Sequence, residues 1–301
     1  MRIGLDCRIY SSKFTGLGRY TYELVENFTK LNGRLKNHHE LILFFNNPEF
    51  QEFPNHPHVQ KILVNCKHYS LKEQTTFLAK LNKEKLDLVH FPHFNVPIFY
   101  NKPFTVTIHD LTLTHFPGRK MTKWYHRLAY HLTIKHAIKK SKKIIAVSNH
   151  TKEDLIKNFK INPTKIAVIY NGISSHFKKI PHTASEISKT LKKYEITKPF
   201  LLYTGVWRNH KNLPRLIEAF KILPDPSALK LVITGRPDPH YPEVKNTVKS
   251  FHLEKEIIFS GLVEENELVH LYNAAAIFVF PSLYEGFGLP PLEAMQCGTP
   301  V

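Results

Sequence analysis

Short runs of β-branched and aromatic residues alternate with helical patterns along almost the whole chain. Such alternation is typical of βαβ units, in which each helix returns the chain so that successive strands lie parallel. The sequence therefore predicts an α/β protein built on parallel sheets. The segments expected to form strands are 2–9, 40–46, 86–91, 104–110, 143–148, 165–172, 200–205, 229–235, 256–261 and 276–282.

A polar stretch, residues 180–198, interrupts this alternation and carries a short helical pattern but no strand. We expect it to link two Rossmann-like domains, residues 1–179 and residues 199–301, that face each other across a cleft. Ligands of open α/β sheets bind at the carboxyl ends of the strands, so the loops there are the candidates for chemistry. A second half of about 150 residues would run past Val301, so we expect this domain to be incomplete.

The charge of the chain is strongly positive, with 42 Lys and Arg against 25 Asp and Glu. A net charge of +17 indicates an anionic partner, which the charge alone leaves open between nucleic acid, a membrane surface and phosphorylated ligands. A merely solvated lysine-rich surface is the alternative. Because no apolar run approaches about 20 residues, and the sparse cysteines Cys7, Cys66 and Cys297 suit reduced thiols, we expect a cytoplasmic protein.

The stretch "SLYEGFGLPPLEAM" combines two glycines, two adjacent prolines and two glutamates. Pro290 and Pro291 fix the start of a helix, and Gly286 and Gly288 let backbone amides approach a ligand. A helix N-terminus with free amides suits a diphosphate, and a nearby carboxylate accepts hydrogen bonds from sugar or ribose hydroxyls. The alternative is a proline-started helix whose two glutamates only face solvent.

A second candidate anion site lies in "YTGVWRNHKNLPRLIEAF". Asn212 is placed to cap the helix, Pro214 fits its first turn, and Lys211 stands beside its positively polarised N-terminus with Arg208 close by. A lysine is unfavourable there unless an anion joins it, which favours a phosphate. A lysine that reaches back to solvent is the alternative.

Two further loops are candidates. Gly16 and Gly18 open a helix, with Arg19 facing an anion, although the third glycine of a dinucleotide fingerprint is replaced by Thr21. His109 and Asp110 end a buried strand, where a polar pair is either satisfied structurally or used in function.

No Asp-x-Asp, HExxH or Walker motif occurs, and His90 and His93 have no further ligands near them in sequence, so we predict no metal site.

The segment 119–143 predicts a basic amphipathic helix with Lys123, Arg127, His131, Lys135 and Lys139 on one ridge. Such a helix either covers the sheet with a solvated face or lies on an anionic membrane. Its expected apolar side comprises Trp124, Leu128, Leu132 and Ile138.

Taken together, the motifs resemble glycosyltransferase family 4, the retaining nucleotide-sugar enzymes of GT-B fold. The resemblance covers nearly the whole chain. It is carried, in order, by "MRIGLDCRIYSSKFTGLGRYTYEL", "TIHDL", "IIAVSNHTKEDL" with "VIYNGI", "YTGVWRNHKNLPRLIEAF" and "FVFPSLYEGFGLPPLEAMQCGTPV".

The resemblance implies roles for individual residues. Glu293 would hold the donor ribose, Glu285 with the amides of Phe287 and Gly288 would hold the sugar, and Lys211 would neutralise the diphosphate. His109 would contact the transferred sugar. Gly16 and Gly18 would let the first domain, on the acceptor side, close over the phosphates. Arg19 and Arg208 are added as candidate cations, the latter because His210 stands where many members have a basic residue.

We therefore expect a retaining hexosyltransferase that moves mannose from GDP-mannose to a glycan or lipid-linked acceptor in cell-surface polysaccharide synthesis. It would act in the cytoplasm or at the inner membrane face, with a nucleotide sugar as substrate, no cofactor and no metal. The alternative is a truncated, inactive remnant that binds nucleotide sugars. A nucleic-acid binder rests on charge alone, and we expect no nucleic acid as partner.

Overall fold

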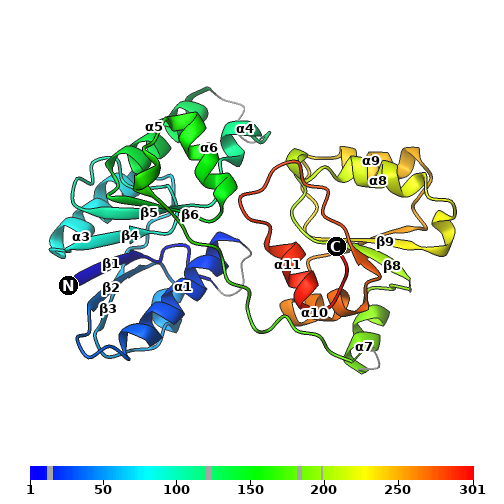
Figure 1. Ribbon diagram of the computed structural model, residues 1–301, viewed down its shortest axis with the longest axis horizontal. Coiled ribbons are helices and arrows are strands. Elements are labelled where there is room, and N and C mark those ends of the chain that lie inside the picture. The colour runs from blue at the N-terminus through cyan, green and yellow to red at the C-terminus, as the bar shows by residue number, and fades with distance from the viewer. Residues whose placement is uncertain (12–15, 120–123, 182–184, 198) are drawn as a thin grey trace. The chain divides into compact units, whose positions relative to one another are not determined.

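The computed structural model describes residues 1–11, 16–119, 124–181, 185–197 and 199–301, and these form two compact units (Figure 1). Unit 1 comprises Met1–Leu111 and Lys123–Asn171, and unit 2 comprises Thr112–Thr122 and Gly172–Val301. The chain therefore enters unit 2 briefly, returns to unit 1, and then completes unit 2. The α/β class with parallel sheets, predicted from the sequence, is confirmed in both units.

Within the described part of the chain, unit 1 holds a seven-stranded sheet of order β3-β2-β1-β4-β5-β6-β7 in which all neighbours run parallel. Apolar residues of β2 are buried on both faces, as expected for a strand inside a parallel sheet. The strands are β1 (Arg2–Asp6), β2 (Glu40–Phe45), β3 (Val59–Leu63), β4 (Leu88–Phe91), β5 (Phe104–Ile108), β6 (Lys143–Ala146) and β7 (Ile166–Val168).

Helices flank this sheet (Figure 1). Helix α6 begins at a Ser148 cap, whose hydroxyl accepts a hydrogen bond from the Thr151 amide. The helices of unit 1 are α1 (Leu17–Asn32), α2 (Glu49–Glu52), α3 (Leu78–Lys83), α5 (Trp124–Lys140) and α6 (Asn149–Phe159). A π-helical turn, Glu73–Phe77, leads into α3.

The edge strand β3 was missed in the sequence, because its residues are only partly buried and include Gln60 and Lys61. Its pattern therefore lacks the apolar continuity that marked its neighbours. The omission matters because the loop after β3 reaches the carboxyl edge of the sheet.

Of the two alternatives for the basic helix, the one in which its apolar side covers the sheet is wrong for the first half of the helix. Ile134, Ala137 and Ile138 are buried against the sheet, but Trp124, Leu128 and Leu132 are exposed. The exposed fraction of Trp124 is 74%. In a later turn the His136 ring stacks on Phe104 of β5, whereas the expected apolar side does not cover the sheet in the first turns. Lys123, the first residue of the predicted ridge, lies outside the described residues.

Unit 2 holds a four-stranded parallel sheet of order β10-β9-β8-β11 in the described residues. The strands are β8 (Phe200–Tyr203), β9 (Lys230–Thr234), β10 (Ile257–Gly261) and β11 (Ile277–Phe278). The helices are α4 (Thr112–His115), α7 (Ser185–Lys193), α8 (Leu213–Lys221), α9 (Glu243–Ser250), α10 (Glu265–Ala274) and α11 (Leu289–Gln296).

The two faces of this sheet are buried by different helices (Figure 1). Phe200, Leu202 and Val232 pack in one apolar cluster with residues of α7, α10 and α11. Tyr203 and Leu231 point to the other face and pack with residues of α8 and α9. The alternation follows from the two-residue period of a strand, and it makes the sheet an apolar platform for loops at its ends.

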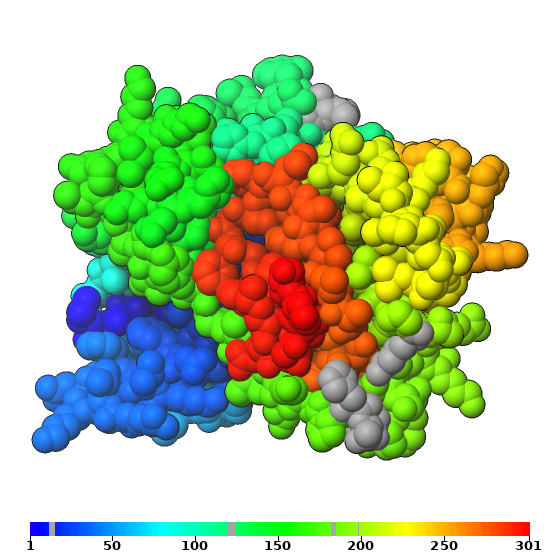
Figure 2. Space-filling model, turned by 45° about the vertical axis from the view of Figure 1, so that its right-hand side comes forward, coloured from blue at the N-terminus to red at the C-terminus, as the bar shows by residue number. Residues whose placement is uncertain are grey.

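The segment 180–198 differs from the predicted linker, because it contributes to the core of unit 2. Ile187 of α7 and Ile196 are buried in the cluster around Phe200. At the other end of the sequence, α11 and the residues after it lie at the surface of unit 2, drawn red in Figure 2. There the Pro300 carbonyl accepts a hydrogen bond from the Phe278 amide of β11.

Gly235, at the end of β9, provides a test of this packing. Its φ is +106°, and an added Cβ would lie 2.1 Å from the Gly205 carbonyl oxygen. Gly235→Ala should therefore lower the free energy of unfolding in urea by at least about 2 kcal/mol. Gly172→Ala is the matched control, since a Cβ there meets nothing within 4 Å. Equal effects of the two variants would contradict the packing described.

Candidate functional site

The strand order of unit 2 brings two loops together. Strand β8 lies between β9 and β11, so the chain leaves β8 toward one side of the sheet and returns with β11 on the other. Such a reversal point is where ligands bind in open α/β sheets, outside the carboxyl ends of the strands. The loop after β8 carries Arg208 and Lys211, and the loop after β11 carries Glu285.

Lys211 and Glu285 meet directly in this structure. The Lys211 Nζ donates to Glu285 Oε1 at 2.5 Å, and their side chains are 14% and 25% exposed. The ammonium group also lies 5.6 Å from the centre of the Phe280 ring. The sequence singled out both residues but did not predict their ion pair.

Two hydrogen bonds to backbone carbonyls hold the loops after β8 and β11 beside each other. The Leu283 amide donates to the His210 carbonyl at 2.8 Å, two residues before Glu285 and one residue before Lys211. Asn212 adds a bond from Nδ2 to the Pro281 carbonyl at 3.3 Å. The predicted capping role of Asn212 is wrong, because the residue is left-handed (φ 57°) and makes no side-chain cap on α8. Its amide instead connects the two loops.

Glu293 lies in α11, as predicted, and is only 7% exposed. Its Oε2 accepts a hydrogen bond from the Tyr272 hydroxyl at 3.1 Å, and that hydroxyl also contacts Thr204 Oγ1 at the end of β8. Burial, and then the charge of Glu293, raises the pKa of Tyr272. The tyrosine therefore stays a neutral donor that fixes the Glu293 carboxylate.

Gly288 precedes α11 with φ 89°, a left-handed conformation that favours glycine. It follows Phe287, so the amides of both residues lie at the start of the helix, as the sequence predicted. Arg208 is exposed and lines a cavity of about 210 Å³ together with Asn209, His210, Tyr241 and residues 115–118.

The remaining predicted residues belong to unit 1. Gly16 takes φ 68° immediately before α1, whereas Gly18 is buried in the first turn of that helix and Arg19 is half-buried beside it. His109 follows β5, and its ring packs edge-on against Tyr20 of α1, with 4.6 Å between the ring centres. The structure thus brings His109 next to the helix that Gly16 opens.

His109 is held as a neutral ring. Burial lowers its pKa, although the hydrogen bond to Pro92 and the charge of Asp110 oppose this. Nε2 lies 2.8 Å from the Pro92 carbonyl oxygen, which can only accept, so the proton is on Nε2 and Nδ1 is an acceptor. Such a ring can accept a hydrogen bond from a hydroxyl.

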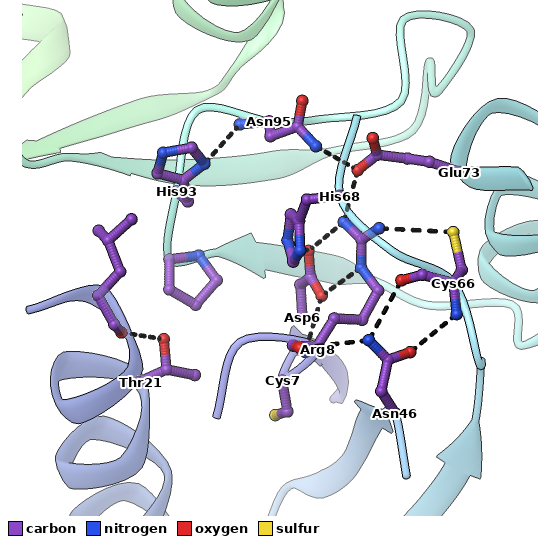
Figure 3. A network of polar contacts seen from close by, with 12 residues as sticks. Asp6, Cys7, Arg8, Thr21, Asn46, Cys66, His68, Glu73, His93 and Asn95 are labelled. Atoms are coloured by element: carbon purple, nitrogen blue, oxygen red, sulfur yellow. Dashed lines mark hydrogen bonds and ion pairs between the residues drawn. The ribbon is translucent and has the colours of Figure 1, made fainter. Parts of the chain in front are cut away.

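A buried polar network that the sequence reasoning missed lies at the end of β1 (Figure 3). Arg8 donates from Nε and Nη2 to the two oxygens of Asp6, at 2.8 and 2.7 Å. Nη2 also donates to Glu73 Oε1 at 2.7 Å, and the Asn95 amide donates to the same oxygen at 2.5 Å. The signal available in the sequence was the charged pair in "LDCRI", which was taken only as part of a strand.

The charges of this network are unequal, because one guanidinium faces two carboxylates. Burial alone would raise the pKa of Asp6, but the charge of Arg8 and its hydrogen bonds outweigh this and lower it. For Glu73 burial dominates, and its pKa is raised despite Arg8. Arg8 is fully buried and lies 3.9 Å from the centre of the Phe77 ring, so the network is a fixed structural element.

Histidines surround this element and stay neutral. Burial, and then repulsion from Arg8, lowers the pKa of His68 to about 4. Burial, and then repulsion from His109, lowers that of His90 to about 4 as well. His90 lies between the hydroxyls of Thr105 and Thr107, at 2.9 and 3.2 Å from its two ring nitrogens. In the described residues no cluster of His, Cys, Asp and Glu is arranged to hold a metal ion.

Comparisons with known proteins place this geometry in a family. The sequence profile of Glycosyltransferase Family 4 matches residues 14–177, more than half of the chain. The chain belongs to glycosyltransferase family 4. A second profile, Glycosyl transferases group 1, matches residues 186–301. The resemblance inferred from the motifs is thereby confirmed.

Among curated relatives of this family-4 chain are two O-antigen chain mannosyltransferases. RfbU of Salmonella typhimurium is 31% identical over 224 residues, which are 74% of this chain and 57% of that protein. Mannosyltransferase B of Escherichia coli is 29% identical over 311 residues, covering 95% of this chain and 78% of that protein. The chain thus spans between about half and four fifths of the length of these relatives.

Solved structures show the same fold. Sucrose-phosphate synthase from Thermosynechococcus elongatus aligns with a TM-score of 0.74 at 19% identity, covering 100% of this chain and 80% of the other. Anabaena HepE in complex with UDP-glucose aligns with a TM-score of 0.71 at 18% identity, covering 100% of this chain and 79% of the other. The GT-B fold expected from the resemblance is confirmed.

The neutral histidines of unit 1 predict a pH dependence of stability. Their folded pKa values near 4 lie below the usual 6.5, so the unfolded chain binds more protons between these pH values. The stability that depends on these neutral histidines should be fully present above about pH 6.5 and be lost as the pH falls toward 4. Urea unfolding measured between pH 4.5 and 6.5 should show this loss.

His90→Gln should reduce the slope of the free energy of unfolding against pH by about one proton, because it removes one of the titrating groups. The matched control is His126→Gln, at an exposed position of α5. A slope that is equal in both variants would contradict the assignment of His90.

Proposed function

We propose that the protein is a retaining mannosyltransferase that moves mannose from GDP-mannose to a glycan or lipid-linked acceptor. Transferase activity is supported by the family, and mannose by the relatives named O-antigen chain mannosyltransferase. The single observation that carries the donor site is the Lys211–Glu285 pair where the ends of β8 and β11 adjoin. A cation and an acceptor of hydroxyl groups are there held side by side, beside the N-terminus of α11.

In the proposed reaction the bond between the sugar C1 and the β-phosphate oxygen breaks. C1 then bonds to the acceptor hydroxyl oxygen on the same face, the hydroxyl proton is released, and GDP leaves. Negative charge grows on the diphosphate as that bond breaks. Lys211 would stabilise this charge, which lowers the barrier where charge develops, while the amides of Phe287 and Gly288 would hold the sugar together with Glu285.

The two glutamates would recognise different parts of the donor. Glu285 pairs with Lys211 and is partly exposed, so its oxygens would accept hydrogen bonds from the sugar hydroxyls beside the diphosphate. Glu293 is buried and fixed by Tyr272, and would accept from the ribose hydroxyls. The carboxylates would act as acceptors of hydrogen bonds, without a need for proton transfer by either.

We further propose that the protein works on the cytoplasmic face of a membrane and contacts it through α5. The first turns of this helix expose Trp124, Leu128 and Leu132, while Arg127 and Lys135 are exposed near them. Exposed aromatic and aliphatic side chains among cations suit an anionic lipid interface. In the described residues no helix combines the length and apolarity of a membrane span.

Titration calorimetry with GDP and GDP-mannose should separate the two glutamate roles. Glu293→Gln should weaken both ligands about tenfold, because both carry the ribose, which corresponds to about 1.4 kcal/mol. Glu285→Gln should weaken the binding of GDP-mannose relative to that of GDP, because only the former carries the sugar. Glu218→Gln, on the exposed face of α8, is the control.

Unchanged affinity for both ligands in both variants would remove the proposed donor site. Tighter binding of UDP-glucose than of GDP-mannose by the unaltered protein would instead contradict the donor while keeping the site.

Sedimentation with phosphatidylglycerol vesicles tests the membrane proposal. Trp124→Ala should weaken vesicle binding about tenfold, because an interfacial aromatic anchor is lost. Ile222→Ala is the control, since Ile222 is an apolar residue of unit 2 that is 82% exposed. If Trp124→Ala and Ile222→Ala bind vesicles equally, α5 is not the contact.

A further inference from the structure

A segment from the first half of the sequence forms part of unit 2. Residues Thr112–Arg119, here called the strap, follow β5 and begin with α4. Their far end is fastened to the start of α9. Arg119 donates from Nη1 to the His240 carbonyl at 2.7 Å and from Nη2 to Glu243 Oε1 at 3.2 Å. Its guanidinium also lies 5.3 Å from the centre of the Tyr241 ring.

The middle of the strap touches the residues that precede the ion pair. The Phe116 ring lies 5.9 Å from the His210 ring and 6.1 Å from the Tyr284 ring, measured between centres. His115 lies 5.0 Å from Tyr284 in the same way. His210 and Tyr284 are 6% and 9% exposed, so the strap rings are part of what buries them.

His210 and Tyr284 are the neighbours of Lys211 and Glu285 in the chain. The Phe116 ring therefore contacts both loops of the candidate site. These are the two loops that the Leu283–His210 hydrogen bond joins. A cavity of about 210 Å³ remains between the strap and Arg208 and Asn209. Since this space is not filled by side chains, the loops have room to move if the ring is removed.

We propose that Phe116 is a positioning residue that holds His210 and Tyr284, and through them keeps Lys211 and Glu285 at the places from which their side chains bind the donor. The inference rests on the proposed donor role of that pair. Phe116 directly follows the end of α4 and lies three residues before the Arg119 anchor, so the strap is fixed on both sides of the ring. Displacement of a binding group by about 1 Å is enough to lower a rate a hundredfold, so a loosened loop pair should lose function before it loses its fold.

The test compares Phe116→Ala, Phe116→Tyr and Lys211→Ala in the full chain. Phe116→Ala should raise the Kd for GDP about tenfold and lower kcat for sugar transfer, with a thermal unfolding midpoint within a few degrees of the unaltered protein. Phe116→Tyr keeps the ring and should restore both values to within about twofold. Arg119→Ala should act in the same direction as Phe116→Ala, because it frees the anchored end.

The outcomes separate the two proposals. If Lys211→Ala weakens GDP binding but Phe116→Ala changes neither Kd nor kcat, the positioning role is overturned and the donor site stands. If Lys211→Ala has no effect on GDP affinity, the donor site fails and the positioning role fails with it. If GDP affinity and kcat fall only in step with the thermal unfolding midpoint, and Phe116→Tyr does not restore them, Phe116 has a structural role alone and the positioning role is overturned. Should Phe116→Ala not fold, Phe116→Leu, which keeps apolar volume without the ring, takes its place.

Discussion

The ion pair between Lys211 and Glu285 depends on the order of strands in unit 2. These residues are far apart in the sequence, and only the pairing of β11 with β8 makes the loops after those strands adjacent. The apolar clusters on both faces of the sheet hold that pairing, and the Leu283–His210 hydrogen bond fixes the loops above it. Packing of the core therefore decides the position of the two charged groups.

Unit 1 also has charged side chains at the end of a strand, but there they are buried. There Arg8 is buried between Asp6 and Glu73, and Asn95 satisfies Glu73 further. Removing one partner from such a network leaves a buried charge without compensation, which costs far more than a surface pair is worth. The network therefore binds together the ends of β1 and β4 and the loop after β3. In unit 2 the pair is partly exposed, so a ligand can reach it.

Much of the fold was predictable from the sequence because local periodicity carries it. The apolar runs of β2 and β9 and the helix start at Pro290 and Pro291 indicate their structure without knowledge of the rest. The strand order was not predictable, because it depends on which apolar faces pack together. β3 was missed because an edge strand needs no continuous apolar run.

The candidate site was likewise predictable only in part from the sequence. Loop composition pointed to Lys211, Glu285 and Glu293, but not to the partner of each. The strap was out of reach of sequence reasoning, since residues 112–119 adjoin a strand of unit 1 yet pack in unit 2. The sequence left open whether the apolar side of α5 covers the sheet, because periodicity shows that a face is apolar and does not show what covers it.

The central claim is that Lys211, paired with Glu285 in this structure, is the group that binds the diphosphate, and a double-mutant cycle on GDP affinity tests it most directly. An incoming diphosphate competes with Glu285 for the Lys211 ammonium. We predict that Glu285→Gln strengthens GDP binding, that Lys211→Ala weakens it, and that Glu285→Gln has no effect once Lys211 is alanine. Strictly additive effects would mean that the two residues act on GDP independently, and would contradict the account.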